Sequence, residues 1–102
     1  MKVVLNRDFG GFSLSKEAAE FLGLKWDGFG FFKYIEYDDG HFHRDDPDLV
    51  RCVQKLGKKA NGRFAFLTVI TIPDNIDWYI DEYDGAECVR ERGHCWPEED
   101  ML

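Results

Sequence analysis

The stretch that decides the fold is residues 72–96, which read IPDNIDWYIDEYDGAECVRERGHCW. Asp84-Gly85 lies between two short runs of alternating residues. This dipeptide in that setting is the strongest short-range sign of a β-hairpin, because the turn needs positive φ at both central positions. A two-residue loop predicts four cross-strand pairs: Tyr83 with Ala86, Glu82 with Glu87, Ile80 with Val89 and Trp78 with Glu91.

The predicted register gathers three glutamates on one face of the hairpin, namely Glu82, Glu87 and Glu91. Like charges directly opposite each other destabilise a sheet, so we expect water, a basic side chain or a ligand to offset the repulsion. A solvated face is the commonest arrangement for charged strand residues. The alternatives are an arginine-clamped packing site, a ligand pocket and, least favoured, a divalent-metal site, which needs more oxygen ligands than one hairpin face offers.

The rest of the chain predicts a strand over residues 2–6, a strand or irregular extended segment over 26–37, and a strand over 63–72. A helix is expected over residues 14–22, capped by Ser13 or Ser15, and another begins at Pro47 with Asp46 as N-cap and ends near Gly57. The order β-α-β-α-β-β-β predicts an α+β fold in which two helices pack on one face of a mainly antiparallel sheet.

Length and composition predict one domain over residues 1–96, followed by an acidic and flexible tail over 97–102. The net charge of −7 argues against direct binding of nucleic acid, which requires Lys and Arg to neutralise phosphates. No signal peptide opens the chain and no run of 18 apolar residues occurs, so we expect a cytoplasmic protein that does not span a membrane. The odd number of cysteines, 3, also fits a reducing compartment.

A glycine turn at Gly10-Gly11 precedes Ser13 and the first predicted helix, and such a turn can present backbone N–H groups to an anion. It lacks the Rossmann glycine spacing and the P-loop lysine, so a tight turn followed by a helix cap is the simpler interpretation. Arg44 and Arg63 are both candidates to meet either the hairpin glutamates or a phosphate, since a guanidinium binds both groups bidentately.

The 9 Phe, 4 Tyr and 3 Trp residues exceed what a small core needs, so some of them are candidates for a platform on which a base or a partner stacks. The histidines and cysteines show no Cys-x-x-Cys, and His94 is adjacent to Cys95 rather than spaced for one tetrahedral site, which disfavours zinc. A cysteine nucleophile with a histidine base has no recognisable local signature either. We therefore expect no metal, no cofactor and no catalytic residue.

Three segments carry a family resemblance: KVVLNRDFGGFSLS, RDDPDLVRCVQKLGKKANGRFAFLTVITIPD and WYIDEYDGAECVRERGHCW. Together they resemble a widespread family of small, mostly uncharacterised proteins of bacteriophages and prophages. The family pattern has Gly-Gly-Phe plus a small residue near the start, Arg-x-Asp-Pro before a helix, and Ile-Pro-Asp followed by Trp-x-Ile-x-Glu-Tyr-Asp-Gly-x-Glu. It ends in His-Arg-x-Trp, where this chain has Arg92-Gly93-His94-Cys95-Trp96. The resemblance implies a phage protein that modulates its host or antagonises host defence.

The leading hypothesis is therefore a non-enzymatic phage accessory protein that counters host defence by sequestering a small anionic, nucleotide-derived molecule. Its ligand site is expected at Gly10, Gly11, Phe12, Ser13, Arg44, Trp78, Tyr83 and Glu87. The alternative is an acidic inhibitor that covers a host nucleic-acid or defence enzyme, and a small hydrolase ranks third. The many aromatics and the unpaired strand edges also predict a homo-oligomer.

Overall fold

The hairpin at Asp84-Gly85 is present in the structure, a computed structural model that describes residues 1–26, 28, 43–91 and 94–97. Strand β3 (Tyr79–Tyr83) pairs antiparallel with β4 (Ala86–Glu91), and the ladder contains three of the four predicted pairs, those of residues 83/86, 82/87 and 80/89. Trp78 lies just before β3, outside the ladder. Asp84 has φ 51° and Gly85 has φ 91°, as this turn requires.

The α+β class is confirmed, with the strands in two antiparallel sheets rather than one. Strand β1 (Lys2–Asn6) pairs with β2 (Leu67–Thr71), and β4 lies between β3 and β5 (His94–Trp96). The reason for two sheets lies in β1, which is apolar on both faces. Val4 belongs to one hydrophobic cluster, whereas Val3 and Leu5 belong to another, so β1 is sandwiched between two cores.

Both predicted helices are present, with the caps that their sequences indicate. Helix α1 (Lys16–Phe21) is capped by Ser15, whose hydroxyl accepts the Ala18 N–H at 3.0 Å. Helix α2 (Pro47–Leu56) is capped by Asp46, whose carboxylate accepts the Asp48 N–H at 2.8 Å. A 3₁₀ turn, η1 (Gly57–Ala60), continues from α2.

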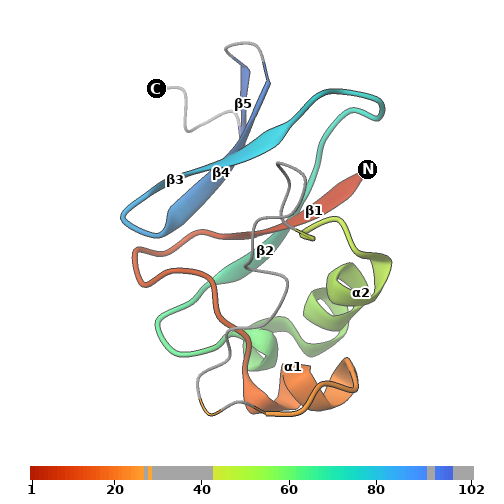
Figure 1. The fold of residues 1–102 in the computed structure, drawn as a ribbon, viewed down its shortest axis with the longest axis vertical. Coiled ribbons are helices and arrows are strands. Elements are labelled where there is room, and N and C mark those ends of the chain that lie inside the picture. The colour runs from red at the N-terminus through yellow and green to blue at the C-terminus, as the bar shows by residue number, and fades with distance from the viewer. Residues whose placement is uncertain (27, 29–42, 92–93, 98–102) are drawn as a thin grey trace.

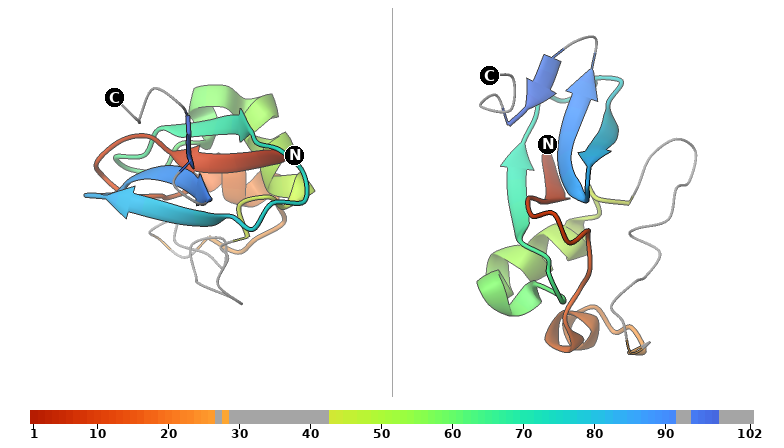
Figure 2. Two further views of the ribbon diagram at one scale, coloured as in Figure 1. Left: turned by 90° about the horizontal axis from the view of Figure 1, so that it is seen from above. Right: turned by 90° about the vertical axis from the view of Figure 1, so that its left-hand side faces the viewer.

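The elements form three layers, with the helices below, the β1–β2 sheet in the middle and the β3–β4–β5 sheet above (Figure 1). The right-hand view of Figure 2 again has the helices at the bottom and β5 at the top. The lower core packs the helices on the middle sheet and includes Leu14, Leu49 and Leu67. The upper core fills the space between the sheets and includes Ile72, Trp78 and Val89. The lower core meets the expectation of helices on one face of a sheet.

Four details differ from the sequence prediction or lie outside the described residues. The strand expected over residues 63–72 begins only at Leu67, because Phe64 takes a positive φ of 65° that no β-strand allows. The short strand β5 was not predicted, since its sequence shows no alternation. The strand expected over residues 26–37 falls almost wholly among residues 27 and 29–42, which the structure does not describe, as does the tail beyond Pro97.

Candidate functional site

Two of the predicted site residues, Arg44 and Glu87, bind each other in the interior. Arg44 donates from Nη1 to Glu87 Oε1 at 2.5 Å and from Nη2 to Glu87 Oε2 at 2.9 Å, a bidentate pair. The two residues are only 1% and 4% exposed. Of the arrangements open at the sequence level for Glu87, the structure has the arginine-clamped packing site, whereas Glu82, opposite it in the ladder, faces solvent.

Further groups complete the surroundings of this pair. The backbone N–H of Asn6 donates to Glu87 Oε1 at 2.8 Å, and Arg7 donates to the backbone carbonyl of Glu87. The Phe12 ring lies under the guanidinium, with its centroid 3.7 Å from Arg44 Cζ. We call Asn6, Phe12, Arg44 and Glu87 the Arg44 corner. Because its charges bond within the protein, the corner ties the hairpin to β1 and to the entry of α2.

The Gly10-Gly11 turn packs between the hairpin and the loop before β2. A Cβ built on Gly85 would lie 2.5 Å from the backbone nitrogen of Gly11, and one built on Gly10 would lie 2.1 Å from Phe64 Cβ. Both glycines are therefore required by close approach, and Gly85 also by its φ. The sequence interpretation gave a tight turn followed by a helix cap, and the structure adds that this turn packs closely against the hairpin and Phe64.

The eight residues of the predicted ligand site fall into four places. Trp78 is 6% exposed in the upper core, whereas Tyr83 is 76% exposed at the end of β3. Gly10 and Ser13 line an open pocket, and the other four belong to the Arg44 corner or contact the hairpin turn. The structure thus places Gly10 and Ser13 in a pocket whose other lining residues did not belong to the predicted ligand site.

We call this cavity of about 570 Å³ the Arg63 pocket. Its described lining consists of Gly10, Ser13, Ser15, Trp26, Gly28, Asn61, Gly62, Arg63 and Phe64. The pocket joins the glycine turn to the Asn61–Phe64 segment through paired backbone: the Gly62 N–H donates to the Ser13 carbonyl at 3.0 Å, and the Ser13 hydroxyl donates to the Arg63 carbonyl at 3.2 Å.

The Arg63 pocket combines a cation with aromatic surface. Arg63 is exposed, and its Cζ lies 5.2 Å from the centroid of the Phe64 ring. Phe64 is itself 69% exposed and held at positive φ, a strained conformation for a residue with a side chain. Trp26 supplies a second ring to the lining. Such a set of groups can hold an anionic, planar molecule, because guanidinium binds phosphate or carboxylate and rings stack on a base.

The sequence singled out Arg63, Gly10 and Ser13, but not Trp26, Asn61, Gly62 and Phe64, which line the same pocket. Asn61-Gly62 was interpreted only as a turn into a strand, and Phe64 as part of that strand. The feature that ties this segment to the pocket is the close packing of Gly62, where a Cβ would lie 2.3 Å from Ser13 Oγ. That close approach depends on the tertiary fold, so the sequence alone does not reveal it.

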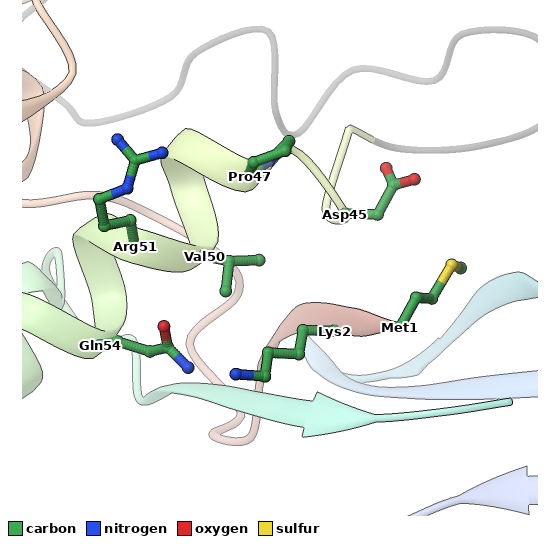
Figure 3. Close-up of a pocket in the computed structure, with 7 residues that line it drawn as sticks. All are labelled: Met1, Lys2, Asp45, Pro47, Val50, Arg51 and Gln54. Carbon is green, nitrogen blue, oxygen red and sulfur yellow. The ribbon is translucent and has the colours of Figure 1, made fainter. Parts of the chain in front are cut away.

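A second pocket, of about 430 Å³, lies between the start of β1 and the first turns of α2 (Figure 3). Its described lining is Met1, Lys2, Asp45, Pro47, Val50, Arg51 and Gln54. The side chains of Lys2 and Gln54 extend toward each other across the space below Val50 (Figure 3). Arg51 already binds Asp48 at 3.2 Å. No aromatic ring belongs to this described lining, so it is less suited to a base.

All three cysteines are buried as free thiols. Burial raises the pKa of Cys52 to about 11 and that of Cys88 to about 12, which keeps both thiols protonated near neutral pH. Within the part of the chain that the structure describes, no three His, Cys, Asp or Glu side chains converge as a metal site would need. The helices of these residues are all too short or too polar to cross a bilayer.

Comparisons of the chain with protein-family models, with curated proteins and with solved structures found no match. The site is therefore interpreted from its own geometry.

Proposed function

We propose that the protein binds and sequesters a small anionic, nucleotide-derived molecule in the Arg63 pocket. The observation that carries the proposal is the pairing, in one cavity of about 570 Å³, of the Arg63 cation with the rings of Trp26 and Phe64. The volume lies within the 300–1,000 Å³ that small-molecule sites usually occupy. Here Arg63 takes the phosphate-binding role that the sequence analysis assigned to Arg44.

Each group has a distinct role in the proposal. Arg63 donates to the phosphate, the base stacks on Phe64 or Trp26, and the side-chain amide of Asn61, whose oxygen accepts the Leu67 N–H, lies in the lining with its NH2 group to donate to the ligand. A hydrogen bond to a charged group contributes about 1.5–3 kcal/mol, and base stacking on a ring about 1–3 kcal/mol per base. Together these contributions support binding without any catalytic group.

The biological part of the proposal rests on the resemblance to phage proteins. A phage protein made in the host cytoplasm would counter a defence system by removing the nucleotide signal that activates it. Sequestration without turnover predicts that the ligand is recovered chemically unchanged. Mass spectrometry of small molecules released on denaturing protein purified from defence-activated cells tests this, and recovery of a cleavage product would favour the small hydrolase instead.

Calorimetry with cyclic nucleotides and ADP-ribose derivatives tests the binding site. For the ligand that binds, we expect Arg63→Gln to weaken affinity by about 10-fold to 100-fold, the equivalent of one charge-assisted bond. Arg51→Gln is the matched control, because it removes an exposed arginine from the other pocket and should leave affinity unchanged. Absence of heat with every compound, or equal losses for the two variants, would contradict the proposal.

One observation favours the second candidate, an acidic inhibitor of a host nucleic-acid or defence enzyme. Phe9, Phe64 and Phe66 are 67%, 69% and 50% exposed in a chain of net charge −7. They lie near one another, because Gly10 packs on Phe64 and the Arg7 N–H bonds the Phe66 carbonyl. Exposed rings on a chain of net negative charge fit a basic protein partner. A salt-dependent pull-down of a host enzyme, lost in Phe66→Ser but retained in Arg63→Gln, would favour this function.

We also propose that the chain forms a homo-oligomer. Within the described residues β2 pairs with β1 alone, and its other edge, like that of β3, is open to a second copy. Tyr79 in β3 is 47% exposed and is a candidate interface residue, whereas Trp78 is buried in the upper core. Light scattering at micromolar concentration tests the proposal, and a mass of one chain that does not change on tenfold concentration would refute it.

A further inference from the structure

Cys88 and Cys95 lie on neighbouring strands and on the same face of the upper sheet. The β4–β5 ladder pairs Arg90 with Cys95, and Cys88 precedes Arg90 by two residues, so Cys88 is the diagonal neighbour of Cys95. Cys95 is also one of the groups that raise the pKa of Cys88, as a close neighbour does. The fold therefore places two free thiols on neighbouring positions of adjacent strands, although six residues separate them in the chain.

The surroundings of this thiol pair differ from those of a cysteine in an ordinary core. The opposite face of the upper sheet, with Val89, packs into the upper core, whereas the face with the thiols also carries Asp81 and Arg90. These two residues form an ion pair at 2.5 Å with side chains 46% and 40% exposed. Cys88 is 8% exposed and Cys95 1%. The thiols are thus shielded, but they are flanked by an exposed ion pair rather than by packed hydrocarbon.

We propose that Cys88 and Cys95 form a reversible dithiol–disulfide site that two-electron oxidants act on. With hydrogen peroxide, the sulfur of one cysteine attacks the O–O bond, which gives a sulfenic acid and one water. The second thiol then attacks that sulfur, the S–S bond forms and a second water leaves. Two thiols are oxidised and one peroxide is reduced to two waters. Reduction by dithiothreitol restores both thiols.

The geometry allows this bond at the cost of a small movement. Diagonal neighbours in an antiparallel sheet have α-carbons about 7–8 Å apart, and a disulfide needs them within about 7 Å. Strand β5 has three residues, and within the described part of the chain it pairs on one side only, with β4. A short edge strand of this kind can shift toward its neighbour more readily than a central strand. The bond would then fix β5 to β4.

The reaction should be slow at neutral pH and faster in alkali. The attacking species is the thiolate, and burial, followed by the neighbouring Cys95, raises the pKa of Cys88 to about 12, against a smaller opposing effect of Arg90. Cys52 is the internal control. It is buried in the lower core, with its Sγ 3.9 Å from the Ala18 carbonyl oxygen, and has no second thiol in its cluster of packed residues.

The experiment treats the folded protein with diamide or hydrogen peroxide, quenches in acid, denatures, alkylates with N-ethylmaleimide and maps peptides by mass spectrometry. We expect two thiols to be lost and Cys52 to remain alkylated, with one peptide pair joined through Cys88 and Cys95. Dithiothreitol should return all three thiols. Protein oxidised in urea should give mixed pairings, because the fold no longer selects the partner.

Variants make the assignment specific. Cys52→Ser should form the same disulfide as the parent, whereas Cys88→Ser and Cys95→Ser should form no intramolecular disulfide. The peptide map of the parent is decisive even where a variant does not fold. Three thiols that stay free in the oxidised parent, a bond that includes Cys52, or bonds only between chains would each overturn the proposal.

Discussion

Arg44 and Arg63 both touch the segment Gly10–Ser13, yet their surroundings are opposite. Arg44 is 1% exposed, lies over the Phe12 ring and forms a bidentate pair with Glu87. Arg63 is exposed at the rim of the larger pocket, and its backbone carbonyl accepts the Ser13 hydroxyl. The comparison teaches that burial, rather than residue type, decides which arginine stabilises the fold and which is available to a ligand.

The largest expected effect comes from removing the negative charge in the Arg44 corner. Glu87→Gln leaves the Arg44 guanidinium buried without its counter-charge, and breaking a buried pair in this way costs about 3–5 kcal/mol. Urea unfolding measures the loss. The matched control is Glu82→Gln, at the opposite position of the ladder but facing solvent, and it should change the free energy of unfolding by no more than about 0.5 kcal/mol.

A double variant separates the charge from the packing. Arg44→Met with Glu87→Leu replaces both partners by apolar groups, so it should lose less stability than Glu87→Gln alone. Equal losses for Glu87→Gln and Glu82→Gln would show that the corner contributes no more than a surface pair.

The contact of the glycine turn with the hairpin gives the next largest effect. Gly85→Ala adds a Cβ 2.5 Å from the Gly11 nitrogen at a φ of 91°, and backbone strain with overpacking should together cost about 2–4 kcal/mol. Gly23→Ala is the control, because Gly23 also has positive φ, 70°, but open space around its Cβ. It should cost about 1–2 kcal/mol. Thermal or urea unfolding of both variants decides whether close approach adds to the strain.

Burial of the Cys88 thiol also predicts how the stability of the protein depends on pH. Since the folded-state pKa of Cys88, about 12, lies above its ordinary value of 9.0, the folded state favours the protonated thiol. The resulting stability is fully present below about pH 9 and is lost as pH rises toward 12. Between pH 8 and 10.5, in the presence of a reductant, the parent should lose about 1–2 kcal/mol more than Cys88→Ala. If the free energy of unfolding falls equally in the two proteins over this pH range, the raised pKa of Cys88 is contradicted.

The smallest expected effect is at the Arg63 pocket, where a substitution should raise the free energy of unfolding instead of lowering it. Phe64 is held at φ 65° with its ring 69% exposed, so Phe64→Gly relieves strain and loses little packing. We expect the free energy of unfolding to rise by about 0.5–1 kcal/mol. Ligand affinity should fall at the same time, because the stacking ring is gone. If Phe64→Gly is less stable and binds the ligand as tightly as the parent, the strained conformation of Phe64 does not serve ligand binding.

The sequence predicted the local parts of this structure and missed those that depend on distant contacts. Asp84-Gly85 predicted the hairpin and its register, and Asp46-Pro47 predicted the start of α2, because both signals act through adjacent backbone. The buried pair could not be chosen in advance. Arg44 and Arg63 were equal candidates by chemistry, and only the tertiary fold places one of them beside a glutamate 43 residues away.

The site shows the same division. Ser13 and Gly10 were identified from a local glycine turn, and both line the pocket. Phe64 was missed as a pocket residue because its aromatic neighbours made the segment resemble a strand, although its backbone leaves the strand conformation. The second sheet was missed for a related reason. An apolar run such as β1 does not show whether one face of the strand or both faces pack against other elements.

The hydrogen bond from the Asn6 N–H to Glu87 joins residues 81 apart in the chain, and this distance sets the order of folding. The β3–β4 hairpin can close by itself in about 1–10 μs, because its contacts are local. The Arg44 corner can form only after both ends of the chain have met, so its contacts are non-local. Refolding is therefore expected in milliseconds to seconds rather than microseconds, with β1 docking on the preformed hairpin as the late step.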